Sequence, residues 1–356
     1  MTSTQQSSGS PRHCDILIRH ALVIDGSGAE PVQADVAVRN GRIVAVGQLA
    51  GWQAEQEIDG TARVLSPGFI DAHTHDDTNV IRTPEMFPKL SQGVTTVVVG
   101  NCGISAAPVT LKGDPPDPMN LLGKSEAFHY PSFASYVEAV NAAQPAINVA
   151  ALVGHTALRN NHMDRLDRAA SDAEIDGMRA QLREALEHGA LGLSTGLAYG
   201  NAINAPTEEV LALAEPLAEF GGLYATHLRS EFADILNAMD EAFRIGKHAR
   251  VPVVISHLKC AGVENWGAQQ RSAAGTGRRL AAPACGLRLL SLHCQLVHAG
   301  PETGHRRLRH PGHLVGAASG AGRQDAQADR RRLGRGPARR CRAPDAGRGR
   351  LSLHVG

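Results

Sequence analysis

Aromatic residues make up only 4% of this 356-residue chain, and its six cysteines include no CxxC pair. The scattered cysteines exclude a disulfide scaffold and indicate a reducing compartment, so we expect a cytoplasmic protein. No apolar run reaches membrane-spanning length, and residues 1–13, rich in Ser, Gln and Thr, lack the apolar core of a secretory signal. We therefore expect a disordered leader at 1–13 and no membrane partner.

Seven residue types are absent after Gly267, namely Ile, Phe, Tyr, Trp, Met, Lys and Asn. The stretch 268–356 carries 17 arginines against four acidic residues, although the whole chain has a formal net charge of only +1. A segment without large apolar side chains cannot easily build a packed core. We interpret 268–356 as an Arg/Gly/Ala-rich tail, produced in our hypothesis by a frameshift near Ala268. It has no aromatic interleaving and no recognisable nucleic-acid motif, so we expect no nucleic-acid partner.

Short alternating segments between residues 14 and 64 predict a small β-domain. Apolar and polar residues alternate over 15–23, 34–38 and 42–46, as on strands with one buried face. Asn40-Gly41 separates two of these segments, and Asn-Gly is a strong signal for a tight hairpin turn. We expect a small antiparallel sheet that ends near Val64.

From residue 65 to 267 the pattern changes to alternating strands and helices. Continuous β-branched runs at 93–100 and 147–154 indicate strands that are buried on both faces. Ser171-Asp172-Ala173-Glu174 is a capping box, which begins a helix. Strand ends recur about every 30 residues, the size of one unit of an eight-fold barrel, so we predict an α/β fold with an incomplete TIM-like (β/α) barrel of about six strands. Further strands are expected at 191–197, 223–226 and 251–256, and helices at 207–220 and 232–248.

Histidines and one cysteine stand at the ends of these strands. His73 and His75 close an apolar strand and, on a strand, would point to the same face. The later strands are followed by Cys102, His155, His227 and His257. A lone histidine at a strand end is more often structural, and a lone cysteine is more often a small buried hydrophobe. Because all strand C-termini of a barrel meet on one face, the recurrence of these residues predicts a metal site there.

Mixed Cys and His ligands favour zinc over magnesium or calcium, which prefer oxygen ligands. Zinc lowers the pKa of a bound water to about 7, and it polarises a carbonyl group toward attack. The residues therefore predict a zinc-dependent hydrolase of an amide or ester-like bond, and they leave the substrate open.

Six motifs occur in this order: PGFIDAHTHDD (67–77), SQGVTTVVVGNCGIS (91–105), NVAALVGHTALR (148–159), LGLSTGLAYG (191–200), YATHLRSE (224–231) and VPVVISHLKC (251–260). Together they resemble the D-aminoacylase family, the N-acyl-D-amino-acid deacylases of the amidohydrolase superfamily. The resemblance covers about residues 14–267, and the cysteine of NCGIS points to this branch of the superfamily.

The resemblance implies a small-molecule substrate, an N-acyl-D-amino acid, that is hydrolysed to a carboxylate and a D-amino acid. It also implies one zinc ion held tightly by Cys102, His227 and His257, and a second, weaker metal position at His73 and His75. The strand LGLSTGL has no lysine to bridge two metals, which fits the branch that uses a cysteine.

Three further residues receive predicted roles from the resemblance. Lys259 matches a family lysine that binds the substrate carboxylate, with a solvated surface lysine as the alternative. His155 either contacts the substrate or is structural. We expect Asp71 to orient a ligand imidazole or support the loop rather than bind metal.

The sequence also departs from the family. The family's general-base aspartate, at the end of the eighth barrel strand, has no match, and no family segment follows Trp266-Gly267. We predict that the chain as written is a poorly folded monomer with little or no deacylase activity. Two other interpretations stay open, a cyclic-amide hydrolase related to hydantoinases or dihydroorotases, and a non-catalytic zinc-binding remnant. Cys102 and the missing strand-four lysine argue against the cyclic-amide hydrolase.

Overall fold

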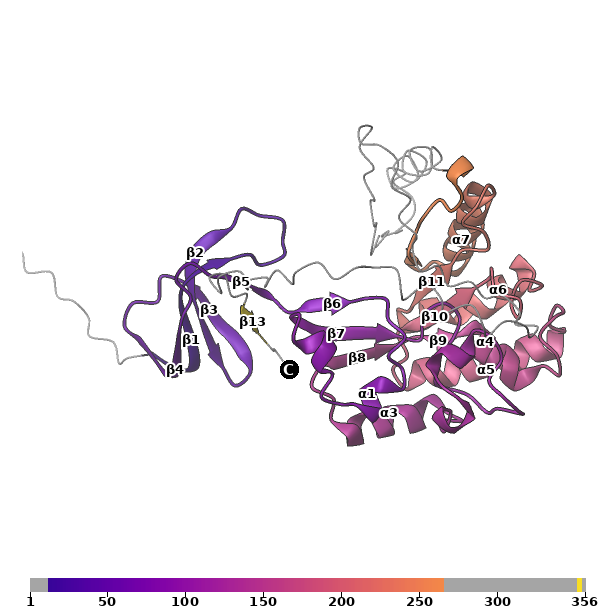
Figure 1. The fold of residues 1–356 in the computed structure, drawn as a ribbon, viewed down its shortest axis with the longest axis horizontal. Coiled ribbons are helices and arrows are strands. Elements are labelled where there is room, and N and C mark those ends of the chain that lie inside the picture. The colour runs from indigo at the N-terminus through magenta and orange to yellow at the C-terminus, as the bar shows by residue number, and fades with distance from the viewer. Residues whose placement is uncertain (1–11, 266–350, 354–356) are drawn as a thin grey trace, which may run out of the picture. The chain divides into compact units, whose positions relative to one another are not determined.

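The computed structural model describes residues 12–265 and the backbone of 351–353 (Figure 1). The predicted leader lies almost entirely outside the described residues, and so does the predicted tail at 268–356 apart from the short strand β13 (Leu351–Leu353). Among the described residues, no helix combines the length and apolar character needed to cross a membrane.

The N-terminal strands form a mixed sheet, so the prediction of a purely antiparallel sheet was wrong. β1 (Arg12–Val23), β2 (Val32–Arg39) and β3 (Arg42–Gly47) pair antiparallel in chain order. The chain then crosses over, and β4 (Trp52–Asp59) and β5 (Val64–Pro67) both pair with β1 in the same direction. β13 adds a further parallel strand beside β5.

The predicted hairpin turn is confirmed between β2 and β3. Asn40 and Gly41 have positive φ angles of 51° and 69°, the left-handed conformation that a tight hairpin turn requires at both positions. Leu17 and Ile18, neighbours on β1, are both buried but belong to two separate apolar clusters. This alternation shows that the N-terminal sheet buries side chains on both faces.

The second part of the fold is a parallel β/α portion, as the sequence predicts. Its strands form a three-stranded sheet and a four-stranded sheet, each in chain order, and each strand pairs only in parallel. They are β6 (Phe69–Asp71), β7 (Val94–Val99), β8 (Asn148–Ala151), β9 (Val153–Gly154), β10 (Gly192–Gly196), β11 (Leu223–His227) and β12 (Val253–Ile255). β8 and β9 are one stretch interrupted at Leu152, whose N–H donates to the Val99 carbonyl at 3.0 Å. All strand C-termini therefore point toward the same edge.

Helices connect these strands, largely where the sequence predicts them. The capping box is confirmed, because the Ser171 and Glu174 side chains each bond the other's backbone N–H. The helix predicted at 207–220 is α-helical only to Ala214, because Pro216 has no N–H to continue the α-helical pattern, and it goes on as a 3-10 helix. The helices are α1 (Asn79–Arg82), α2 (Phe87–Leu90), α3 (Phe133–Ala143), α4 (His155–His162), α5 (Asp172–Glu187), α6 (Thr207–Ala214) and α7 (Ile235–Ala249), with 3-10 turns η1 (Met119–Leu122), η2 (Ser125–Ala127), η3 (Glu215–Phe220) and η4 (Val263–Asn265).

The largest apolar cluster joins α5, α6 and α7 to the strands β9 to β12. Met178 and Leu182 on α5, Leu193 on β10, Ile245 on α7 and Val253 on β12 are all fully buried in it. Burying a large apolar side chain contributes about 1.5–3 kcal/mol. This packing fixes the strands against their helices and so sets the positions of the strand ends that carry the site.

Candidate metal centre

Cys102 lies on the loop that follows β7, and close backbone packing fixes it there. The residue has a positive φ of 55° and is only 2% exposed. The Ser194 hydroxyl on β10 donates to the Gly100 carbonyl and accepts the Gly103 N–H at 3.0 Å. A Cβ at Gly196 would lie 2.2 Å from the Cys102 carbonyl oxygen, so only glycine fits at that position. Sequence reasoning missed Ser194, although it stands in the quoted motif LGLSTGLAYG.

The five residues predicted as metal ligands are brought together by the structure. The Cys102 Sγ lies 3.3 Å from Nε2 of His73 and 3.5 Å from Nε2 of His257. Ring centroids are 4.4 Å apart for His227 and His257, and 5.5 Å apart for His73 and His75. Two overlapping groups of potential ligand atoms share Cys102, and within each group all the atoms lie within 4.8 Å of one another. Their role as metal ligands stays a prediction.

His73 and His75 lie in the loop after β6, because this strand already ends at Asp71. Strand alternation therefore does not explain why their rings converge. Asp71 instead accepts the backbone N–H of His73 at 3.3 Å and pairs with Lys89 Nζ at 2.6 Å. Lys89 also contacts Asp76 at 3.1 Å. Of the two roles predicted for Asp71, the structure thus shows support of the loop.

The electrostatics of the cluster favour neutral imidazoles that face a buried thiol. Burial and the neighbouring His257 lower the pKa of His73 to about 3, and burial lowers the pKa of His227 to about 4. Burial raises the pKa of the Cys102 thiol to about 12. Among the described residues, the buried Nδ1 of His75 has no hydrogen-bond partner. This set of lone pairs with a sulfur ligand fits a soft cation such as zinc, which would stabilise the thiolate.

Glu231 and Tyr199, which sequence reasoning missed, contact the candidate ligands. The Glu231 carboxylate accepts from His257 Nδ1 at 2.9 Å and forms an ion pair with Lys259. Burial acts to raise the pKa of Glu231, but the hydrogen bonds from these two residues outweigh it and the pKa is lowered. The Tyr199 hydroxyl lies 3.2 Å from His227 Nδ1. Both residues stand in quoted motifs, and a carboxylate four residues after a strand-end histidine is the signal that could have found Glu231.

Lys259 lies beside the ligands, with its side chain 52% exposed and its ammonium paired with Glu231. This position is compatible with its predicted role toward a substrate carboxylate, and that role stays a prediction.

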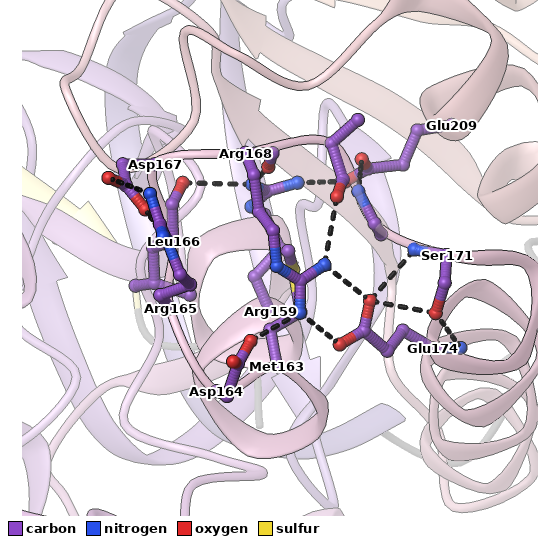
Figure 2. A network of polar contacts seen from close by, with 12 residues as sticks. Arg159, Met163, Asp164, Arg165, Leu166, Asp167, Arg168, Ser171, Glu174 and Glu209 are labelled. Atoms are coloured by element: carbon purple, nitrogen blue, oxygen red, sulfur yellow. Dashed lines mark hydrogen bonds and ion pairs between the residues drawn. The ribbon is translucent and has the colours of Figure 1, made fainter.

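His155, in contrast, is fully buried and contacts Glu209, which belongs with Arg159 to the network of polar contacts that Figure 2 shows. Its Nε2 lies 2.9 Å from Oε1 of Glu209, and Arg159 forms an ion pair with the same oxygen. The other oxygen of Glu209 accepts the Ala170 N–H at 3.0 Å. His155 has no exposed surface to offer a substrate, so of its two predicted roles the structure favours the structural one.

Comparison with known proteins places this geometry in a family. A model of the amidohydrolase family matches residues 56–303. The chain belongs to that family. The match extends past the boundary that the sequence predicts at Ala268. Relatives place the chain with the D-aminoacylases and N-acyl-D-amino-acid deacylases, as the motifs indicate.

Two relatives come from Alcaligenes xylosoxydans xylosoxydans. The chain is 46% identical over 262 residues to a D-aminoacylase and 47% identical over 268 residues to an N-acyl-D-aspartate deacylase, matches that cover 74% and 75% of this chain and 54% of each relative. It also resembles the crystal structure of N-acyl-D-glutamate deacylase from Bordetella bronchiseptica, complexed with zinc and a phosphonate inhibitor that mimics the tetrahedral intermediate. That likeness has a TM-score of 0.72 and 41% identity, and it covers 75% of this chain and 56% of that one. The chain therefore spans about half the length of the relatives that it matches.

Proposed function

We propose that this chain acts in the zinc-dependent hydrolysis of N-acyl-D-amino acids to a carboxylate and a free D-amino acid. The observation that carries the proposal is the Cys102 thiol, which lies within 3.5 Å of ring nitrogens on His73 and His257, two histidines from distant parts of the chain. The substrate class is that named for its relatives, which act on N-acyl-D-aspartate and N-acyl-D-glutamate or are D-aminoacylases.

The two overlapping groups of donors suggest two metal positions that share Cys102. In this proposal Cys102, His227 and His257 hold the tighter zinc ion, and His73 and His75 complete a weaker second position. When bound, zinc supplies Lewis acidity, which polarises the acyl carbonyl and makes water a nucleophile near neutral pH.

The chain's own residues orient the substrate and the ligands. The exposed ammonium of Lys259 binds the carboxylate of the N-acyl-D-amino acid by charge, at a point next to His257. The Tyr199 hydroxyl lies 3.2 Å from His227 Nδ1, and in this proposal Nδ1 donates to it, which leaves Nε2 of that ring for the metal. The family's general-base aspartate has no match in the sequence, so we assign no residue to that role and expect weak turnover.

The test loads the purified chain with zinc and compares N-acetyl-D-methionine with N-acetyl-L-methionine, measuring release of the free amino acid. We expect release from the D-enantiomer only, at a rate far below the roughly 1–1,000 s⁻¹ typical of enzymes. Equal release from both enantiomers would contradict the proposed substrate class. Full-rate turnover of the D-enantiomer would support that class and refute the predicted impairment. Opening of a 5-substituted hydantoin, used as a third substrate, would favour the cyclic-amide alternative instead.

A further inference from the structure

We propose that Glu231 is a positioning residue of the candidate metal centre, which fixes Nε2 of His257 as the metal-binding nitrogen and holds Lys259 beside it. The inference rests on the proposed zinc site and extends it to a carboxylate that is not itself a ligand.

Glu231 is held at both its side chain and its backbone. It stands four residues after His227, beyond the end of β11, and its side chain is only 9% exposed. Its Oε1 lies 2.9 Å from His257 Nδ1, and its backbone carbonyl accepts the N–H of Ala261 at 2.7 Å. The carboxylate thus connects the segment after β11 with the segment after β12, the two segments that carry His227 and His257.

The contact with Glu231 decides which nitrogen of His257 faces the site. An ionised carboxylate can only accept a hydrogen bond, so Nδ1 of His257 must carry the hydrogen. Nε2 is then the lone-pair nitrogen, and it lies 3.5 Å from the Cys102 sulfur. A carboxylate behind a metal-binding imidazole fixes the tautomer and the ring orientation, and it raises the basicity of the ligand.

The same carboxylate also places Lys259. Its ammonium forms an ion pair with Oε2 of Glu231, and it lies 3.3 Å from His257 Nδ1. Nδ1 cannot both donate to Glu231 and accept from Lys259, and we assign its hydrogen to the shorter contact, with Glu231 at 2.9 Å, so that the ammonium is held by the carboxylate. Glu231 therefore sets the distance between the predicted substrate-binding cation and the predicted ligands.

Other carboxylates near the candidate ligands act differently. Asp71 accepts the backbone N–H of His73, and Glu241 pairs with Arg229 at 2.7 Å and accepts from Thr207. Glu241 is 11% exposed, nearly as buried as Glu231, and its partners Arg229 and Thr207 are not candidate ligands. It is therefore a matched control for the loss of a buried carboxylate.

The test measures zinc affinity of the full chain by competition with a chromophoric chelator. We expect Glu231→Gln to weaken zinc binding by about 10- to 100-fold, the range found for partners of metal-binding histidines. Glu241→Gln should lower the melting temperature of the metal-free chain and leave zinc affinity within about two-fold. Lys259→Met should also retain zinc affinity, because Lys259 forms an ion pair with Glu231 but is not itself a candidate ligand. In zinc-loaded wild type, ¹⁵N NMR should show the hydrogen of His257 on Nδ1.

The outcomes separate this inference from the proposed function. If wild type binds zinc and Glu231→Gln binds it equally well, the positioning role is overturned while the metal site stands. If wild type binds no zinc, the metal site fails and the positioning role fails with it. If Glu231→Gln does not fold, the NMR measurement on wild type decides, and a hydrogen on Nε2 of His257 would overturn the inference.

Discussion

Two clusters in this chain pair a histidine with a carboxylate at 2.9 Å, yet they are built for different purposes. In the first, His155 meets Glu209, and Arg159 contributes a positive charge to the same carboxylate, with all three residues almost completely buried. In the second, His257 meets Glu231 and belongs to a set of four imidazoles around the Cys102 thiol. The first cluster contains its own counter-charge, whereas the second gathers donors that face one another.

The comparison shows that a histidine at a strand end does not reveal its role by position alone. Glu209 has its pKa lowered to about 2, because the hydrogen bonds and charges of His155 and Arg159 outweigh the opposing effect of burial. The charge of Arg159 is balanced by Glu209 without any ligand, and among the described residues only the buried His155 Nδ1 and Arg159 Nε of these three side chains have no hydrogen-bond partner. The Cys102 cluster instead has imidazole pKa values lowered by burial and by other histidines, and a thiol pKa raised to about 12, so a cation would stabilise it. We infer function where imidazole and thiol donors converge on one another.

The largest predicted effect removes the shared sulfur. Cys102→Ala should reduce zinc from near one ion per chain to near none, since loss of a ligand exceeds the 10- to 100-fold effect expected of an outer partner. Metal content after gel filtration measures this. Cys14→Ala is the matched control, because Cys14 is equally buried but lies in the N-terminal sheet. Full zinc retention in Cys102→Ala would break the distinction between the two clusters.

Removal of the counter-charge from the His155 cluster should affect folding rather than metal. Glu209→Ala leaves Arg159 buried and unpaired, which typically costs about 3–5 kcal/mol in the free energy of unfolding. Urea denaturation monitored by circular dichroism measures the loss. Glu208→Ala, at the adjacent exposed residue that pairs with Arg244, should cost less than about 1 kcal/mol. If folded Glu209→Ala protein also bound zinc more weakly than wild type, the His155 cluster would contribute to metal binding.

Much of the fold was predictable because local sequence patterns indicate its strands, helices and turns. The β-branched runs, the Ser171 capping box and the Asn40-Gly41 turn each place an element from its own residues. The parallel pairing of β4 with β1 was missed, because strand direction depends on a crossover that no local residue signals. The 3-10 ending after α6 was missed as well, although Pro216 was a visible signal.

The candidate site was predictable as a list of residues but not as a set of contacts. Barrel geometry was enough to bring Cys102, His227 and His257 to one edge. It could not show that His155 turns into the interior, because that depends on Glu209, which lies 54 residues further along the chain. Likewise, Glu231 could be seen in its motif, but only the packing of two loops shows that it contacts His257.

The two clusters should also separate along the pH axis in the metal-free chain. Folding lowers the pKa of His73 from 6.5 to about 3 and that of His227 to about 4, so below about pH 6.5 the unfolded chain binds more protons than the folded chain. Stability should therefore fall as the pH decreases from about 6.5 toward 3, by up to about 1.4 kcal/mol per pH unit for each group.

Glu209 contributes in a lower window. Its pKa is lowered from 4.5 to about 2, so the stability that it supplies is complete above about pH 4.5 and is lost as the pH falls toward 2. Urea unfolding at a series of pH values measures both windows. His73→Gln with His227→Gln should flatten only part of the upper window, because burial also lowers the pKa of His155, and Glu209→Gln should remove the lower window. If a variant of one cluster removed the pH dependence in both windows, the protonation of the two clusters would be coupled.

The smallest effect should come from the partly exposed ion pairs that support the loop of His73 and His75. Lys89 is 24% exposed and connects Asp71 with Asp76 on either side of the two histidines. Because a solvent-exposed ion pair contributes about 0–1 kcal/mol, Lys89→Met should cost less than about 1 kcal/mol in urea. Arg183→Met, which breaks the more exposed pair with Glu219, is the control without any link to the loop.

Loss of the support that Lys89 gives to the loop of His73 and His75 should mainly change the affinity for the second zinc ion per chain. His73 and His75 keep their sequence neighbours in Lys89→Met, but Asp71 loses the ammonium that holds it at 2.6 Å. We expect the second equivalent to bind less tightly by under about ten-fold, a smaller change than for a carboxylate that contacts an imidazole directly. Chelator competition at two zinc equivalents measures this, with the first equivalent as internal reference. A loss confined to the first equivalent would mean that Lys89 acts on the Cys102, His227 and His257 group, and that the two positions are not ordered as we propose.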